Sequence, residues 1–330
     1  MKKTILLLVI ALTFAFVSCG DGNQSSASTE GLEYTLLDNG SYEVSGIGSA
    51  TDVDIVIPRE YNGKSVTSIG QNAFYGCHNI TSVKISKGIS SIGQGAFADC
   101  ISIKSIILPD TLNFIGKGAF LGCSSLSYNE YNNAKYLGSA KNPYLALVAA
   151  KKTDITSCQI NKNTKFICNR AFFLCSSLTS VKISSSVTDI GAGAFQGCAS
   201  LSSVTLPSGI NSIEDETFTG CTSLASIIIP SKVSSIGSNA FDGCSFLAEV
   251  NLSDGIDTIK SYAFSNCVSL TNIYLPDSVA SIGSCAFYSC TSLASIDCEA
   301  EVAGEYWAVD WLENCEASVS YGVKQTITYN

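Results

Sequence analysis

The feature that most constrains this chain is an internal repeat of 23 residues, marked by a Phe and by a Cys three residues later. The stretch Gly193–Cys198 reads GAFQGC, and close copies end at Cys77, Cys100, Cys123 and Cys244. The marker Phe residues are 23 positions apart except for one interval of 52; they are Phe74, Phe97, Phe120, Phe172, Phe195, Phe218, Phe241, Phe264 and Phe287. A unit of this length cannot bury its own apolar edge, so the units are expected to stack into a solenoid.

Each unit predicts its own local structure. Val181 and Ile183 alternate with polar neighbours, which is the two-residue period of a strand. Val187 and Ile190 indicate a second short extended piece, and the GAGAFQGC stretch that follows is long enough for one helical or 3₁₀ turn only. Stacked units pair their strands in parallel, and the recurring Phe and Cys fill the same interior position in every unit.

The interval of 52 indicates an insertion of about 29 residues near positions 124–152, because the pattern resumes over Ile155–Cys175. Two apolar stretches flank Asn142-Pro143, and we predict a β-hairpin that projects from one face of the solenoid. Aromatic residues concentrate in it, and they are candidates either for ligand binding or for the small core of the hairpin; they are Tyr128, Tyr131, Tyr136 and Tyr144.

The first and last units of a solenoid need caps that cover their apolar ends. Residues 31–57 contain two strand-like runs around Asp38-Asn39-Gly40, a strong hairpin signal, and are expected to form an N-terminal cap and the first strand. The repeat solenoid then covers residues 58–295. Residues 296–330 break the period and carry both tryptophans, Trp307 and Trp311, so we interpret them as the C-terminal cap.

Residues 1–18 have the pattern of a signal peptide, with Lys2 and Lys3 before an apolar run that is too short to span a membrane. Cys19 follows at once, and a polar tether over residues 19–30 comes next. A signal that ends at Cys resembles the bacterial lipoprotein signal, which implies acylation of Cys19. Ordinary secretion with a chance Cys at this point is the alternative. The protein is therefore expected to be exported and lipid-anchored to the bacterial cell envelope, at the outer membrane or cell surface.

The repeated L-x-S-V-x-L-P-x-x-V-x-S-I-G-x-x-A-F-x-G-C units, such as Leu201–Cys221 and Leu224–Cys244, resemble the BspA-type leucine-rich repeat family from Ile55 to about Cys298. The resemblance implies an α/β-type solenoid: a right-handed coil with a parallel β-sheet, about nine repeats and β-rich caps. It also implies adhesion, since that family includes surface adhesins. The sequence departs from the pattern at residues 214–217, at Cys168 and at Cys298.

The 15 cysteines of an exported chain could suggest a disulfide framework. Those at the repeat position instead point into one interior, where parallel side chains in register lack the torsion that a disulfide needs. We expect them to be reduced and inert, and Cys158 and Cys298 likewise. A Cys298–Cys315 bridge stays open, and Cys285 is unassigned. Thiols spaced 23 residues apart do not converge as zinc requires, so no metal is expected.

No catalytic constellation is found. His78, the one histidine, occupies a variable turn position without a partner nucleophile, and Asp215 and Glu216 are adjacent in one loop, so they cannot flank a scissile bond. No cofactor motif is present. A net charge of -9 without a basic cluster argues against a nucleic-acid partner.

Outward strand positions remain for function, because inward positions are fixed by packing. They form a strip along the parallel sheet. A strip of serines alone would be an ordinary solvated face, so the candidate ligand-binding positions are the larger or charged side chains Lys84, Ile107, Lys182, Ile228 and Tyr274. The sequence predicts a non-catalytic, lipid-anchored surface protein that binds an extracellular or cell-surface macromolecule, a protein or a polysaccharide, and touches the membrane only through its anchor. A periplasm-facing structural or assembly scaffold is the alternative.

Overall fold

The structure is a computed structural model in which residues 28–323 are described. The signal peptide, Cys19 and most of the tether lie outside the described residues. Residues 28–323 contain no helix long and apolar enough to cross a bilayer.

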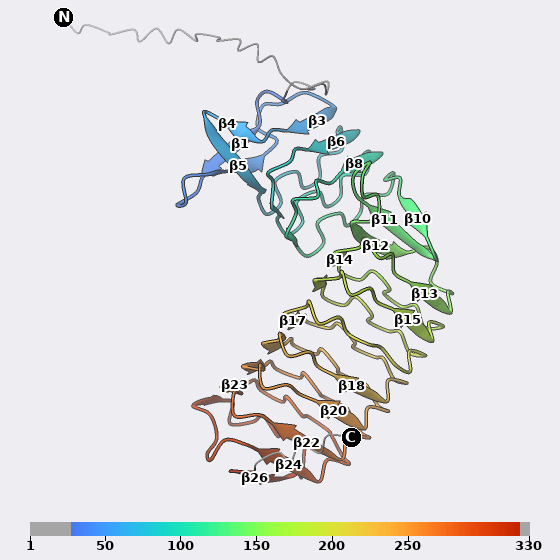
Figure 1. The fold of residues 1–330 in the computed structure, drawn as a ribbon, viewed down its shortest axis with the longest axis vertical. Coiled ribbons are helices and arrows are strands. Elements are labelled where there is room, and N and C mark those ends of the chain that lie inside the picture. The colour runs from blue at the N-terminus through green and yellow to red at the C-terminus, as the bar shows by residue number, and fades with distance from the viewer. Residues whose placement is uncertain (1–27, 324–330) are drawn as a thin grey trace, which may run out of the picture.

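The described chain is a stack of about 12 parallel coils of roughly 23 residues, and it bends along its length (Figure 1). Most coils contribute one strand to each of two faces. In Figure 1 the first set of strands follows the outer edge of the bend, and we call it the outer face. Its strands are β3 (Asp54–Ile57), β6 (Ser82–Ile85), β8 (Ser105–Ile107), β13 (Ser157–Gln159), β15 (Ser180–Lys182), β18 (Ser226–Ile228), β20 (Glu249–Asn251), β22 (Asn272–Leu275), β24 (Ser295–Cys298) and β26 (Ser318–Ser320).

The second set of strands follows the inner edge of the bend and forms the inner face. Most of its members are only two residues long, as the V-x-S-I spacing predicts. They are β2 (Tyr42–Gly46), β5 (Lys64–Ile69), β7 (Ser91–Ile92), β9 (Phe114–Ile115), β12 (Ala146–Ala150), β14 (Phe166–Ile167), β16 (Asp189–Ile190), β17 (Ser212–Ile213), β19 (Ser235–Ile236), β21 (Thr258–Ile259), β23 (Ser281–Ile282) and β25 (Tyr306–Trp307).

The stretch that carries the Phe and the Cys is a run of consecutive turns in every coil, and residues 28–323 contain no α- or 3₁₀-helix. The helical turn expected from the sequence does not form, because residues four apart, such as Gly193 and Gly197, adopt positive φ angles (63° and 75°). In the resulting run of turns, every second amide is directed along the solenoid axis. Gly193, Phe195 and Gly197 donate to the carbonyl oxygens of Asp215, Thr217 and Thr219 in the next coil at 2.8–2.9 Å.

The marker residues form the core as predicted. The Phe rings stack nearly parallel: Phe218, Phe241 and Phe264 are fully buried, with ring centroids 5.4 and 5.3 Å apart. In most coils the Cys thiol donates to the Phe carbonyl oxygen of the coil before it, for example Cys244 Sγ to Phe218 O at 3.2 Å, whereas Cys175 Sγ faces Lys152 O. The Cys therefore fills the core and also gives a second donor to a buried carbonyl that already accepts from Cys221 N at 3.0 Å, which an alanine could not do.

The coil count exceeds nine because the two caps and the insertion also form coils, built from other residues. At the N-terminal end, β1 (Glu33–Leu36) and β2 form the expected antiparallel hairpin, and β4 (Glu60–Tyr61) pairs with β5. At the C-terminal end, β25 and β26 continue both faces beyond residue 295, and Trp311 packs edge-on against Phe287 with ring centroids 5.8 Å apart.

The insertion forms the expected hairpin around Asn142-Pro143, because the strands on either side of it pair antiparallel, but the hairpin does not project from the solenoid. β10 (Asn129–Tyr131), β11 (Ala134–Leu137) and β12 form an antiparallel meander, and β12 then pairs in parallel with β14 as a member of the inner face. Its apolar residues Ala134, Leu137 and Leu147 are buried and belong to the core. They close the coil instead of building a separate core outside it.

The inner face is interrupted just before the insertion, because β9 and β12 share no strand pairing. The buried apolar residues accordingly fall into two clusters, one that ends with Phe166 and one that begins with Ala134. Lys165 bridges the interruption: its Nζ donates to Leu112 O at 2.6 Å and to Asn113 Oδ1 at 2.9 Å. We call this place the seam.

Candidate functional site

The outward positions of the outer face lie in the register that the repeat predicts. Lys84 is paired with Ile107, and Ile228 with Asn251, so these side chains point from the same side of neighbouring strands. Ile228 is 70% exposed and Ile107 45% exposed. Lys84 and Lys182 are exposed, and Tyr274 is half-buried.

The outer-face strip is divided, although the sequence predicts a continuous one. Next to Ile107, where the repeat predicts a full strand, the insertion supplies only Gly138, which forms an isolated β-bridge with Ile107. A second isolated bridge, Ser180 to Ser203, stands where the coil of Thr205 should supply a full strand. Ile107 and Ile228 therefore belong to different hydrogen-bonded sheets, β3-β6-β8 and β18-β20.

The tyrosines of the insertion differ in their exposure. Tyr136 is fully buried, and its hydroxyl has no hydrogen-bond partner, so it cannot contact a partner at the surface. Tyr128, Tyr131 and Tyr144 are half-buried. The rings of Tyr131 and Tyr136 both pack against Tyr144, with centroids 5.7 and 5.5 Å away. These contacts match the alternative that the tyrosines serve a local core.

The cysteines of residues 28–323 are all free thiols, and those at the repeat position are buried except for half-buried Cys77. The prediction of reduced, interior cysteines is confirmed for that part of the chain. The bridge left open between Cys298 and Cys315 does not form. Burial raises the pKa of Cys100 and Cys244 to about 12, which leaves almost no thiolate at neutral pH.

Cys285 gains neighbours that the sequence does not reveal. Its Sγ lies 3.2 Å from Glu313 Oε2 and 3.9 Å from Asp310 Oδ2, and the three ligand atoms lie within 4.8 Å of one another. This is the only such donor set in residues 28–323. One thiol and two carboxylates, one of them exposed, do not make a closed metal site, and we assign no metal to it.

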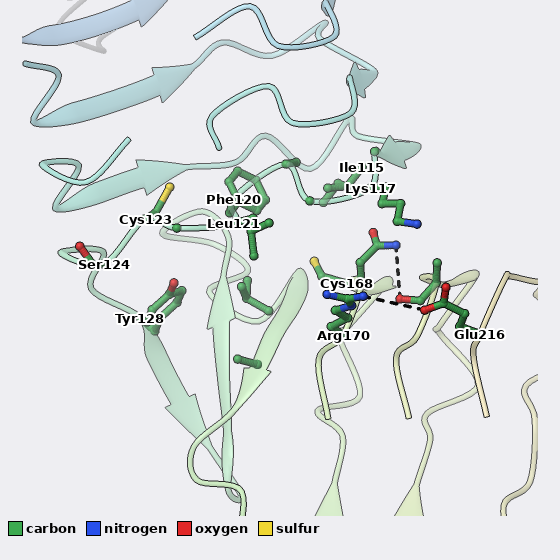
Figure 2. Close-up of a pocket in the computed structure, with 18 residues that line it drawn as sticks. Ile115, Lys117, Phe120, Leu121, Cys123, Ser124, Tyr128, Cys168, Arg170 and Glu216 are labelled. Atoms are coloured by element: carbon green, nitrogen blue, oxygen red, sulfur yellow. Dashed lines mark hydrogen bonds and ion pairs between the residues drawn. The ribbon is translucent and has the colours of Figure 1, made fainter. Parts of the chain in front are cut away.

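An apolar hollow lies at the seam. It has a volume of about 440 Å³ and lies between the turn of residues 116–124 and the turn of residues 168–170 (Figure 2). Phe120 and Leu121 line one side, and Cys168 and Arg170 the other. Arg170 reaches Glu216 across the rim, with Nη2 3.9 Å from Oε2, and its guanidinium lies over the Phe173 ring.

The sequence analysis missed this cavity, although a signal was present. Counting 23 residues back from Phe172 leads to Ala149, so one coil lacks the marker Phe and Cys. A missing marker could have been interpreted as a missing piece of the core.

The repeat matches the model of the BspA-type leucine-rich repeat region over residues 54–140, 149–267 and 212–317, which together span most of the chain. The chain belongs to the BspA-type leucine-rich repeat family. None of the curated proteins compared with the chain matches it.

Several solved structures are similar to this BspA-type chain. A leucine-rich cell surface protein of Faecalibacterium prausnitzii is 22% identical over 91% of this chain and 95% of its own, with a TM-score of 0.35. A leucine-rich repeat protein of Bacteroides ovatus is 24% identical over 91% and 100%, with a TM-score of 0.36. The pneumococcal vaccine antigen PcpA is 18% identical over 79% and 67%, with a TM-score of 0.38. Likeness at this level carries no argument about ligands or activity.

Proposed function

We propose that this protein is a non-catalytic, lipid-anchored binding protein of the bacterial cell envelope. Its partner is an extracellular or cell-surface macromolecule, a protein or a polysaccharide. The observation that carries the proposal is the exposure of Ile228 and Ile107 on an outer face whose other outward positions are mostly Ser, Thr, Asn and Lys. Solvation alone does not select large apolar side chains at such positions, whereas binding surfaces use them.

The exposed lysines support a polar rim. Lys84 is paired with Ile107 on the neighbouring strand, and Lys182 lies on β15, in the same outward series. Ile107 and Ile228 lie in different sheets, and an exposed apolar side chain with polar neighbours at each place is typical of non-obligate protein interfaces. Tyr274 adds an aromatic side chain to the series, and Tyr128, Tyr131 and Tyr144 add half-buried rings at the insertion. Buried Tyr136 is left out of the proposal.

The binding experiment compares the purified protein with an Ile107→Ser/Ile228→Ser variant against a panel of immobilised extracellular matrix proteins and surface polysaccharides. Phe246→Ser is the matched control, since Phe246 is 67% exposed but lies outside the outer-face strands. We expect the double variant to lose at least tenfold in affinity for the bound partner and the control to keep it. Equal affinity of all three proteins would remove the outer face from the proposal.

The anchor and the location are tested separately on cells. Labelled palmitate should be incorporated into the wild-type protein but not into Cys19→Ala. Protease added to intact cells should digest the displayed protein. Digestion only after the envelope is broken would refute surface display and would favour the alternative, a periplasm-facing scaffold.

A further inference from the structure

The seam differs from every other junction between marker-bearing coils in how the turn amides are used. In an ordinary junction three alternate amides donate to three carbonyls of the next coil, as Gly95, Phe97 and Asp99 do toward Lys117, Ala119 and Leu121 at 2.7–2.9 Å. This ladder is polar: donors face the C-terminal neighbour and acceptors face the N-terminal neighbour. A coil without a neighbour on one side therefore leaves either its amide donors or its carbonyl acceptors on that side without hydrogen-bond partners.

At the seam the next row of donors has no acceptor in residues 28–323. The amides of Gly118, Phe120 and Gly122 make no hydrogen bond to the described chain, although their counterparts in the preceding coil are all paired. On the opposite side the carbonyl oxygens of Asn169 and Phe173 receive none either. Phe120 is buried and Gly118 and Asn169 are half-buried, whereas Gly122 and Phe173 are exposed. An unpaired backbone group is costly where water does not reach it, so the cost falls on the first three residues.

The inserted coil explains the two open rows. Its strand β12 supplies the inner-face pairing with β14, but the chain turns away after Ala150, whose amide donates to Ala171 O at 2.6 Å. Only this central acceptor of the second row is used. The insertion thus supplies the strand of a coil and omits its turn.

The Phe column is interrupted at the same place. The ring of Phe120 stacks on Phe97 at 6.1 Å, and stacking resumes only with Phe172 on Phe195 at 5.3 Å. The cavity of about 440 Å³ lies beside Phe120 and is also lined by Val148 and Cys168. Figure 2 shows Phe120 above this space and Cys168 below it. The apolar space and the two open rows of backbone groups form one slot.

We propose that the slot binds a short peptide segment of another protein, which supplies the absent turn. Carbonyl oxygens of the segment accept from the amides of Gly118, Phe120 and Gly122, while Ala171 O keeps its bond from the Ala150 amide. An aromatic or aliphatic side chain of the segment lies against Phe120. This site goes beyond the outer-face proposal, since it uses none of the same residues.

A polypeptide fits these groups better than other ligands. The open donors belong to every second residue along one turn, and the open acceptors belong to residues four apart on the facing turn. In the paired coils, main-chain groups at these positions bond to the main chain of the neighbouring coil. A single anion would need donors that converge on one point, as successive amides of a nest do. Addition of a backbone segment to an open hydrogen-bonding row is an established way for proteins to bind peptides.

The test uses the purified full chain and the acetylated, amidated peptide Gly-Ala-Phe-Gln-Gly-Ser, which copies a repeat turn with Ser for Cys. Hydrogen exchange should slow at least tenfold at Gly118, Phe120 and Gly122 when the peptide saturates, with no change at Gly95, Phe97 and Asp99. Replacing the peptide's Phe by Ala should weaken binding at least tenfold. Val148→Phe, which fills the cavity, should weaken it similarly, whereas Val204→Phe, a half-buried control in another coil, should not.

Three results would overturn the proposal. The first is an unchanged exchange rate at the three amides with millimolar peptide present. The second is equal peptide affinity of Val148→Phe and the wild-type protein. The third is strong protection of the three amides before any peptide is added: if it persists on dilution, the chain's own terminal residues fill the slot, and if it disappears with dissociation of a dimer, a second copy fills it.

Discussion

Truncating one ring of the Phe column tests whether the coils are held together by nearest-neighbour stacking. Phe241 is fully buried between Phe218 and Phe264, with interplanar angles of 9° and 1°. Phe241→Ala removes the ring from both contacts and leaves a cavity, for which a loss of about 3–5 kcal/mol in unfolding free energy is expected. Of that loss, about 0.5–1.5 kcal/mol belongs to each ring pair.

Phe120→Ala is the matched comparison. Phe120 is 7% exposed, stacks on Phe97 alone and already borders the seam cavity. Its truncation removes one ring pair instead of two and should cost about 1 kcal/mol less than Phe241→Ala.

Urea unfolding followed by far-UV circular dichroism measures both losses. Tryptophan fluorescence reports only the C-terminal coils, because Trp307 and Trp311 are the chain's two tryptophans. A double variant with Phe218→Ala should show coupling to Phe241→Ala, since the two rings touch. The reasoning is refuted if Phe120→Ala costs as much as Phe241→Ala, or if the adjacent pair shows no coupling.

Three further predictions concern titration and buried polar groups. Burial raises the pKa of the thiols of Cys100, Cys158 and Cys244 from 9.0 to about 12. The folded state holds these protons more tightly, so the free energy of unfolding is retained below pH 9 and falls as the pH rises toward 12, by about 1.4 kcal/mol per pH unit for each thiol. Denaturant titrations in reductant at pH 8 and pH 10 measure this fall. Equal free energies of unfolding at the two pH values would contradict the prediction. Burial, and then the Glu214 carboxylate, raise the pKa of Asp189 from 3.8 to about 6, so its ionisation at neutral pH opposes folding. Asp189→Asn should therefore be more stable than wild type at pH 8, by on the order of 1 kcal/mol after allowance for solvent screening, and the difference should disappear below pH 4. A difference that does not change with pH would exclude the ionisation of Asp189 as its cause. Tyr136→Phe removes a buried hydroxyl that lies close to the Asn161 backbone without a well-formed hydrogen bond, and it should change the unfolding free energy by less than about 1 kcal/mol, whereas a larger loss would show that the hydroxyl is bonded.

The sequence predicts the repeated part of the fold because each coil is specified by the same few residues. Val181, Phe195 and Cys198 recur at fixed spacing, and their burial in the structure matches their period. The strand register also follows, since a parallel stack aligns equivalent positions such as Cys158 and Val181. The backbone form of the Phe-Cys turn does not follow from the pattern, because a single helical turn and a run of alternating turns bury the same side chains.

The insertion is where prediction from the sequence fails. Its tyrosines suggest an exposed hairpin, yet Tyr136 enters the core and β12 replaces an inner-face strand. Periodicity describes residues that repeat, and this segment occurs once. The seam cavity has a trace in the sequence, the missing marker Phe at Ala149, but the open amides of Gly118, Phe120 and Gly122 have none, because backbone pairing leaves no mark on side-chain spacing.

The one-way order of the turn ladder restricts how the gene for such a protein can change in length. Duplication or loss of a whole 23-residue unit joins a donor row to an acceptor row again and leaves the remaining coils undisturbed. An addition of another length, like the one between Cys123 and Ile155, interrupts that sequence of bonds and creates a new opening in an otherwise uniform rod. Insertions of irregular length are thus a means by which a uniform repeat array acquires positions that differ in structure from the rest.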